Sequence, residues 1–120
     1  GADVIHGSVF DLSEARRWET GLLLDGNVGI GGDPGRLLAC SAGLLRPGGQ
    51  LLVELEAPSV QTRAVNLRLE GPSDVSEWFP WAWVGVDAIA PIAEAAGMKV
   101  SDLWSAGGRW FAQLRLDSVA

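Results

Sequence analysis

Apolar segments alternate with short polar and glycine-rich segments along the whole chain. Short apolar and β-branched runs bounded by glycine, proline or polar residues are typical of strands. The segment Ser105–Gly108 is so short a connection that the two strands it joins must form an antiparallel hairpin. The pattern predicts strands over Asp3–Phe10, Gly21–Asp25, Gln50–Glu56, Met98–Trp104 and Arg109–Leu116.

Two segments have helical rather than strand spacing. The first, Pro34–Leu45, follows Asp33, a residue suited to cap a helix whose first position is proline, and Arg46–Gly49 ends it. The second begins at Asp87 as its cap and runs to about Ala96, where Gly97 stops it. The apolar side chains that we expect to share one face of the first helix are Leu37, Leu38, Ala42, Leu44 and Leu45.

The order of these elements predicts an α/β fold. A helix between two buried strands favours a parallel crossover, and the nearly continuous apolar residues of Gln50–Glu56 indicate a strand buried on both faces. Thr62–Leu69 alternates between apolar and polar residues and is followed by the extended piece Val75–Val86. We interpret residues 1–120 as a single domain with an inserted β-ribbon at about 60–86. Ala15–Thr20 is expected to be a connector.

Composition excludes several classes of function. The 120 residues are 48% apolar and 20% charged, as in a globular domain. A net charge of −6 argues against nucleic acid or an anionic membrane as a partner, and no apolar run approaches the roughly 20 residues that span a bilayer. The single Cys40 cannot form an internal disulfide, which fits a cytoplasmic location. With His6 as the only histidine, we expect neither a zinc site nor a Ser-His-Asp triad.

The segment Leu22–Asp33, LLLDGNVGIGGD, is the strongest candidate for a functional loop. An apolar strand that ends in Asp25 and opens into a glycine-rich loop before a capped helix is the arrangement by which α/β sheets present a ligand-binding loop. The alternative is a connection whose glycines only supply positive φ values. Phosphate-loop motifs are excluded, because no Lys-Ser/Thr pair follows and Pro34 takes the place of a third glycine.

Three segments together resemble the class I S-adenosylmethionine-dependent methyltransferases. They are His6–Asp11 (HGSVFD), Leu22–Val28 (LLLDGNV) and Leu44–Glu54 (LLRPGGQLLVE). The resemblance implies a partial Rossmann-like methyltransferase sheet, with parallel strands, helices and a closing antiparallel hairpin. It also implies S-adenosyl-L-methionine as the cofactor and a small-molecule methyl acceptor.

The resemblance assigns roles to two of these segments. The first is similar to the strand end that cradles the adenine, and the second to the motif that ends the fourth strand of the family. At Ser8 the family commonly has an acid, so the adenine contact there is weakened or moves to the backbone. An ordinary strand end with a capping acid is the alternative for Ser8–Asp11. His6 is expected to be a packed or edge residue. The implied cofactor-binding residues are Ser8, Val9, Asp11, Asp25, Gly26, Asn27 and Val28.

The chain also departs from the family. No acidic, glycine-rich loop precedes Val4, and the acid that grips the ribose on the following strand is missing. We therefore expect the second half of such a domain, inactive by itself. A cut sheet edge beside Val4 would favour a homodimer, with strand swapping as one form of it. The alternative is a non-catalytic α/β assembly module. A dehydrogenase half is disfavoured because its glycine fingerprint is missing.

The tryptophan-rich segment has two candidate roles. On an extended backbone Phe79, Trp81 and Trp83 share one face, and they could form an aromatic lid over the methyl acceptor. A subunit interface or a cover for the sheet is the alternative. Trp104 and Trp110 are expected in the core. Glu54 and Glu56 lie at a strand end where a general base could act, although solvated acids are common there; the pattern assigns no catalytic residue.

Overall fold

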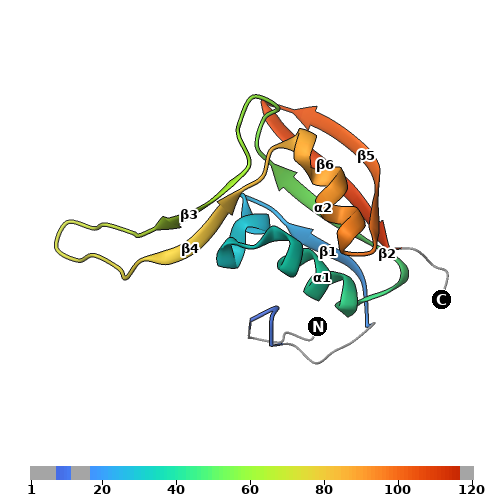
Figure 1. Ribbon diagram of the computed structural model, residues 1–120, viewed down its shortest axis with the longest axis horizontal. Helices are drawn as coiled ribbons and strands as arrows, with labels where there is room; N and C mark the ends of the chain where they lie inside the picture. Colours follow the sequence, from blue (N-terminus) through green and yellow to red (C-terminus); the bar gives the residue numbers. More distant parts are fainter. Residues whose placement is uncertain (1–7, 12–16, 117–120) are drawn as a thin grey trace.

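A four-stranded sheet carries two helices and a projecting two-stranded ribbon (Figure 1). The computed structural model describes residues 8–11 and 17–116. The strands lie in the order β1-β2-β6-β5, with β1 parallel to β2 and both other pairs antiparallel. The predicted parallel crossover and closing hairpin are therefore confirmed. The strands are β1 (Trp18–Leu23), β2 (Leu45–Leu55), β5 (Met98–Ala106) and β6 (Arg109–Leu116).

Helix α1 (Pro34–Leu44) begins as the sequence predicts. The Asp33 side chain accepts a hydrogen bond from the backbone N–H of Arg36 at 3.0 Å, which satisfies one of the otherwise unpaired donors of the first turn. Leu37 and Leu38 are fully buried. The cap and the apolar stripe together fix where this helix starts and which face it turns to the sheet.

The glycine-rich segment between β1 and α1 contains short 3-10 turns. They make up the element η1 (Asn27–Gly32), which is interrupted by a kink at Ile30 and Gly31. Asp25 and Gly26, with φ values of 55° and 76°, lie in the left-handed region and turn the chain out of β1. The predicted strand Gly21–Asp25 thus ends two residues earlier, at Leu23, because Asp25 leaves the extended conformation.

The ribbon consists of β3 (Arg63–Leu67) and β4 (Phe79–Trp83), paired antiparallel. The antiparallel ribbon expected from the sequence is present, and Figure 1 shows that it projects well beyond the sheet. The backbone at the base of the ribbon is in close contact with η1. A Cβ built on Gly29 would lie only 1.9 Å from the carbonyl oxygen of Ala82. Only glycine permits this close approach of two backbones.

The second helix begins later than predicted. Val86–Ala88 form the 3-10 turn η2, closed by the Ala88 N–H on the Gly85 carbonyl at 3.0 Å, and α2 spans Ile89–Ala95. Asp87 lies inside that turn and no side-chain bond caps α2, so its predicted role as cap is wrong. Gly97 ends the helix with φ 82°, as predicted.

Near the amino terminus the prediction is wrong where it can be compared. Ser8–Asp11 form a turn, closed by the Asp11 N–H on the Ser8 carbonyl at 3.0 Å, rather than the end of a strand. Trp18 to Thr20 belong to β1 and not to a connector, because Trp18 pairs with Leu45 and packs on the core. His6 and the rest of the predicted first strand lie outside the described residues.

Helices α1 and α2 lie on the same side of the sheet (Figure 1). Along β2 the buried residues alternate with Leu52 and Glu54, which are only half-buried. The prediction of a strand buried on both faces is therefore wrong. Trp104 is half-buried and stacks on Phe111 at 5.5 Å instead of joining the core. Fully buried core residues include Leu38, Leu45, Val53, Val84, Ile89, Ala93, Met98, Ala112 and Leu114.

No helix in the described part of the chain is long and apolar enough to cross a membrane.

Candidate functional site

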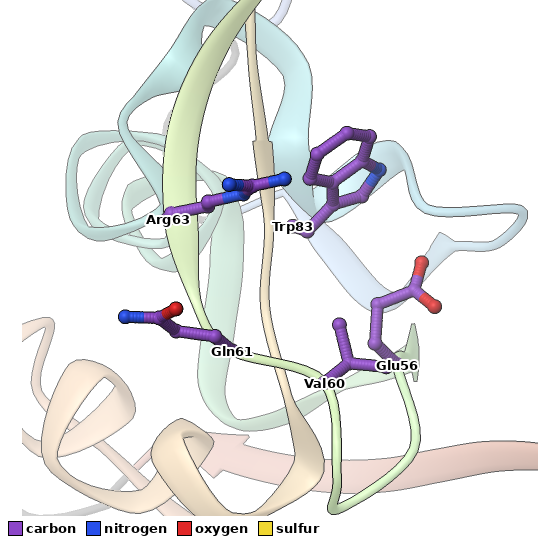
Figure 2. Close-up of a pocket in the computed structure, with 5 residues that line it drawn as sticks. All are labelled: Glu56, Val60, Gln61, Arg63 and Trp83. Carbon is purple, nitrogen blue, oxygen red and sulfur yellow. The ribbon is translucent and has the colours of Figure 1, made fainter.

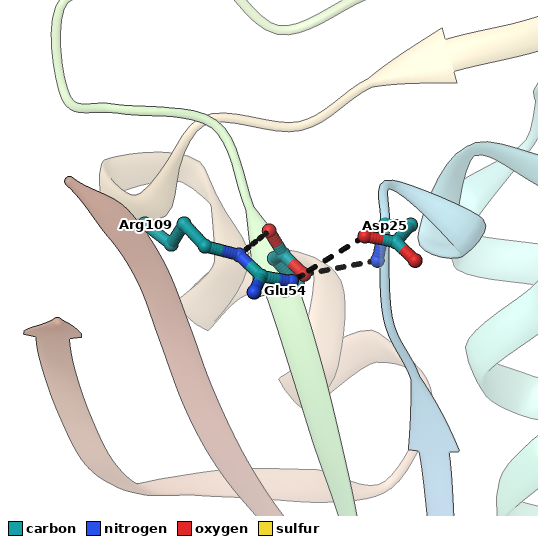
Figure 3. A network of polar contacts seen from close by, with 3 residues as sticks. All are labelled: Asp25, Glu54 and Arg109. Atoms are coloured by element: carbon teal, nitrogen blue, oxygen red, sulfur yellow. Dashed lines mark hydrogen bonds and ion pairs between the residues drawn. The ribbon is translucent and has the colours of Figure 1, made fainter. Parts of the chain in front are cut away.

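Three elements meet where β1 and β2 end and β6 begins (Figure 3). The guanidinium of Arg109 holds Glu54 in two places, with Nε donating to Oε2 at 2.9 Å and Nη2 donating to Oε1 at 2.6 Å. The same Glu54 Oε1 accepts the backbone N–H of Asp25 at 3.0 Å. Nη2 also lies 3.4 Å from Asp25 Oδ1. One carboxylate thereby ties the turn after β1 to the start of the final hairpin strand.

The electrostatics of this network keep Glu54 ionised. Hydrogen bonding from Arg109, and next from the Asp25 N–H, lowers the pKa of Glu54 below its ordinary value, against a smaller opposing effect of burial. The same contact raises the pKa of Arg109. The Glu54 side chain is 14% exposed and that of Arg109 is 54% exposed, so water screens the pair from one side only. Glu54 is thus a structural acid that anchors a turn.

The turn held by Glu54 is conformationally unusual. Asp25 is the one non-glycine residue of the described chain with positive φ, a conformation that costs an ordinary side chain on the order of 1 kcal/mol. Its own side chain is 85% exposed. Strained residues of this kind cluster at binding sites because the surrounding structure must hold them in place. The hydrogen bond to Glu54 provides that hold.

A hollow of about 350 Å³ opens beside this network. Besides Asp25, Glu54 and Arg109, the side chains that give it chemical character are Glu56, Trp81, Trp83 and Trp110. The last two tryptophans of the ribbon therefore lie over the carboxyl ends of the sheet strands. Carboxyl ends of strands are where open α/β sheets bind ligands.

A second hollow has a volume of about 430 Å³ (Figure 2). It is lined by Glu56, Val60, Gln61, Arg63 and Trp83. The guanidinium carbon of Arg63 lies 5.2 Å from the centroid of the Trp83 ring, within the range of a cation–π contact. Glu56 and Trp83 line both hollows.

The predicted cofactor residues divide into three groups. Asp25 and Gly26 line the first hollow. Asn27 is exposed in η1, whereas Val28 is 2% exposed and belongs to the core, so it offers almost no surface to a ligand. Ser8, Val9 and Asp11 sit in the turn whose Phe10 ring packs against Gly31 and under the Arg36 guanidinium at 4.1 Å.

The turn at 8–11 therefore lies beside the end of η1 and the start of α1. The predicted aromatic group is also brought together in part. Trp81 and Trp83 line the first hollow, and Phe79 packs edge-on against Trp81 at 6.2 Å. These placements agree with a shared face for the three aromatic residues.

The sequence singles out neither Arg109 nor the second position of Trp110, at the first hollow. Trp110 packs partly against the core, as predicted, and also lines the first hollow. The signal lies in the hairpin, because β6 runs antiparallel to β2 and its first residues must return to the end of β2. Glu54 pairs with Phe111, and Arg109 lies two residues before Phe111 on the same face of the sheet, so its side chain reaches Glu54 diagonally. Within the described ranges, no cluster of three metal-ligating side chains occurs.

Comparison with known proteins shows the fold. No protein-family model and no curated protein sequence matches the chain. Among solved structures, the chain is similar to the 1,6-didemethyltoxoflavin-N1-methyltransferase of Burkholderia thailandensis, solved with 1,6-didemethyltoxoflavin and S-adenosylhomocysteine bound. The TM-score is 0.67 at 15% identity, over 94% of this chain and 50% of that one.

Two further structures give the same result. A methyltransferase from Bacteroides fragilis, solved with S-adenosylhomocysteine, has a TM-score of 0.67 at 20% identity, over 91% of this chain and 52% of its own. The CcbJ methyltransferase of Streptomyces caelestis has a TM-score of 0.62 at 13% identity, over 94% and 62%. The chain thus spans about half to two thirds of these structures. Its fold is that of part of an S-adenosylmethionine-dependent methyltransferase, a partial Rossmann-like α/β sheet.

Proposed function

We propose that the chain is the later part of an S-adenosylmethionine-dependent methyltransferase that acts on a small-molecule acceptor. The observation that carries this is the fold, which is similar to two solved methyltransferases at TM-scores of 0.67 over more than nine tenths of the chain. The position of the Asp25 turn, at the carboxyl end of β1 and beside a hollow, supports the same conclusion.

The residues around the Asp25 turn fit the cofactor. A Cβ built on Gly26 would meet nothing within 4 Å, so the backbone there is open to a ligand, and the exposed Asp25 carboxylate suits a sulfonium or a ribose hydroxyl. When bound, S-adenosylmethionine supplies an activated methyl group. The remaining task for the protein is to align the acceptor and exclude water.

The side chains of the hollow divide this task. The Glu54–Arg109 pair fixes the Asp25 turn, while Trp81 and Trp83 cover the space beside it. Glu56 is the acid placed to accept a proton from an acceptor, because Glu54 is held by Arg109 and its lowered pKa makes it a weaker base. Of the two glutamates considered as a strand-end base, Glu56 is therefore the one that we propose.

Calorimetric titration tests the proposal. The protein in its full natural length should release saturable heat with S-adenosylmethionine and with S-adenosylhomocysteine, and none with ATP as the control nucleotide. Absence of heat with both sulfur nucleosides would contradict the proposed function.

A non-catalytic assembly module is the second candidate, and the outer part of the ribbon favours it. Leu69, Val75 and Trp78 are 70%, 57% and 63% exposed, and exposed apolar residues in one projecting segment are typical of an interface. In that case the titration above shows no heat, and shortening the ribbon abolishes association with a partner.

We also propose a homodimer in the cytoplasm, with strand swapping as one form of it. Among the described strands β1 lies at the sheet edge, bonded only to β2, and Leu22 on it is 60% exposed. Such an edge can pair with a second chain. Light scattering at micromolar concentration should give twice the monomer mass, and a monomer mass would refute the dimer. The free thiol of Cys40 suits a reducing compartment.

A further inference from the structure

The hollow beside Asp25 combines negative charge with aromatic surface. Three carboxylates and three indoles line it, from Asp25, Glu54, Glu56, Trp81, Trp83 and Trp110. Carboxylates attract a cation, and an indole face attracts it through the ring quadrupole. The two kinds of side chain are therefore complementary to the same kind of ligand.

The charges of the hollow do not cancel. Among the described residues that line it, Arg109 is the only cation, and Glu54 already holds that guanidinium at 2.6 and 2.9 Å. Asp25 is 3.4 Å from the same group and largely in water. Glu56 makes no ion pair with any described residue. The hollow keeps an excess of negative charge centred on Glu56.

Trp83 already takes part in a cation contact within the chain. Arg63 lies over its ring from the second hollow, and Figure 2 shows Glu56 on the side away from Arg63. Trp83 lines both hollows, so the residue that contacts Arg63 also borders the hollow beside Asp25. An anionic ligand there would be repelled by Glu56, and a neutral one would cover that carboxylate without pairing it.

We propose that the methyl acceptor carries a positively charged ammonium group, and that this group binds in the hollow against Glu56 and the indoles of Trp81 and Trp83. The identification of the ligand as the methyl acceptor rests on the proposed function. The ammonium-binding site itself is inferred from the charge and shape of the hollow.

Three probes of one shape and different charge test the inference. Tetramethylammonium, tert-butanol and pivalate are titrated into the protein, and the indole N–H signals of the six tryptophans are followed by NMR. The signals of Trp81 and Trp83 should move with tetramethylammonium only. Those of Trp78 and Trp104, which lie outside the hollow, should stay in place. Equal shifts with the neutral or anionic probe would overturn the inference.

A matched pair of variants tests the role of charge. Glu56→Gln keeps the shape of the side chain and should weaken tetramethylammonium binding about threefold to tenfold. Glu94→Gln removes an exposed acid of α2 that does not line the hollow and should leave the affinity unchanged. Unmoved signals of Trp78 and Trp104 in both variants show that the fold is kept. An equal effect of the two variants would refute the assignment.

The cofactor titration separates this inference from the proposed function. Binding of S-adenosylmethionine without binding of tetramethylammonium overturns the inference and leaves the proposed function standing. Binding of tetramethylammonium without the cofactor overturns the proposed function, and with it the role of the hollow as an acceptor site.

Discussion

Glu54 is the residue through which three strand ends are joined. Its carboxylate binds Arg109 of β6 and the backbone of Asp25 after β1, although it lies in β2 itself. Neither partner is near it in sequence, since Asp25 is 29 positions away and Arg109 is 55 positions away. A strand-end acid could be recognised from the sequence, but its partners could not, because they depend on the register of two strand pairs.

The substitution Glu54→Gln should cost about 0.2–1 kcal/mol of unfolding free energy at neutral pH, as expected for a partly exposed ion pair. The lowered pKa of Glu54 means that its contribution is complete above the ordinary glutamate pKa of about 4.3 and is lost as the pH falls through the folded-state value. Urea unfolding as a function of pH measures this difference.

Wild type and the Glu54→Gln variant should therefore converge in stability in acid. The control is Glu94→Gln, which removes an exposed acid without an ion pair among the described residues. A wild-type advantage over Glu54→Gln that persists unchanged at low pH would show that the pair with Arg109 is not its source.

At the scale of elements, the docking of the ribbon on η1 decides where the tryptophans lie. The contact is between Gly29 and the backbone of Ala82, and it turns the alternate residues Trp81 and Trp83 of β4 toward the hollow. The alternation of the ribbon and its antiparallel pairing could be predicted from the sequence. Its docking could not, because the sequence does not show which of the glycines in the loop contact β4; in the structure they are Gly29 and Gly32.

Gly29→Ala should destabilise the protein by about 1–3 kcal/mol, because the new methyl group would collide with a backbone carbonyl that cannot move independently. Gly43→Ala is the matched control. Gly43 lies in α1, and a methyl group added to it would meet nothing within 4 Å, so this change should stabilise the helix by about 0.5–1 kcal/mol. Thermal unfolding measures both.

Two variants with equal stability would contradict this packing. If Gly29→Ala keeps its stability but Trp81 and Trp83 no longer respond to tetramethylammonium, the substitution has moved the ribbon without destabilising the fold.

The capped helix and the hairpin follow from local signals, whereas the start of α2 does not. Asp33 followed by proline specifies the beginning of α1, and two glycines with φ 58° and 79° make the tight turn of the β5–β6 hairpin. At Asp87 the residue type is equally suitable as a cap. The backbone bond from Ala88 to Gly85 closes a 3-10 turn there instead, a choice that tertiary packing of the buried Val86 favours.

For the whole molecule, the order and direction of the strands in the sheet determine which strand ends lie together and can form one site. The Asp25 turn, Glu56 and Arg109 come together on one rim because β1 and β2 are parallel and β6 returns antiparallel. Gly48, in the first half of β2, and Gly97, just before β5, lie toward the opposite ends of these strands. The fold class could be predicted because helices and strands leave local sequence signals. The residues that share this rim could not, because they depend on the complete sheet topology.

The most direct test of the account maps S-adenosylhomocysteine onto the backbone by amide NMR, using the protein in its full natural length. The account predicts that the amides of Asp25, Gly26 and Asn27 and those of the turn at 8–11 shift on binding, while those of Gly48 and Gly97 stay in place. Shifts confined to the rim of Gly48 and Gly97, with an unchanged Asp25 turn, would contradict it.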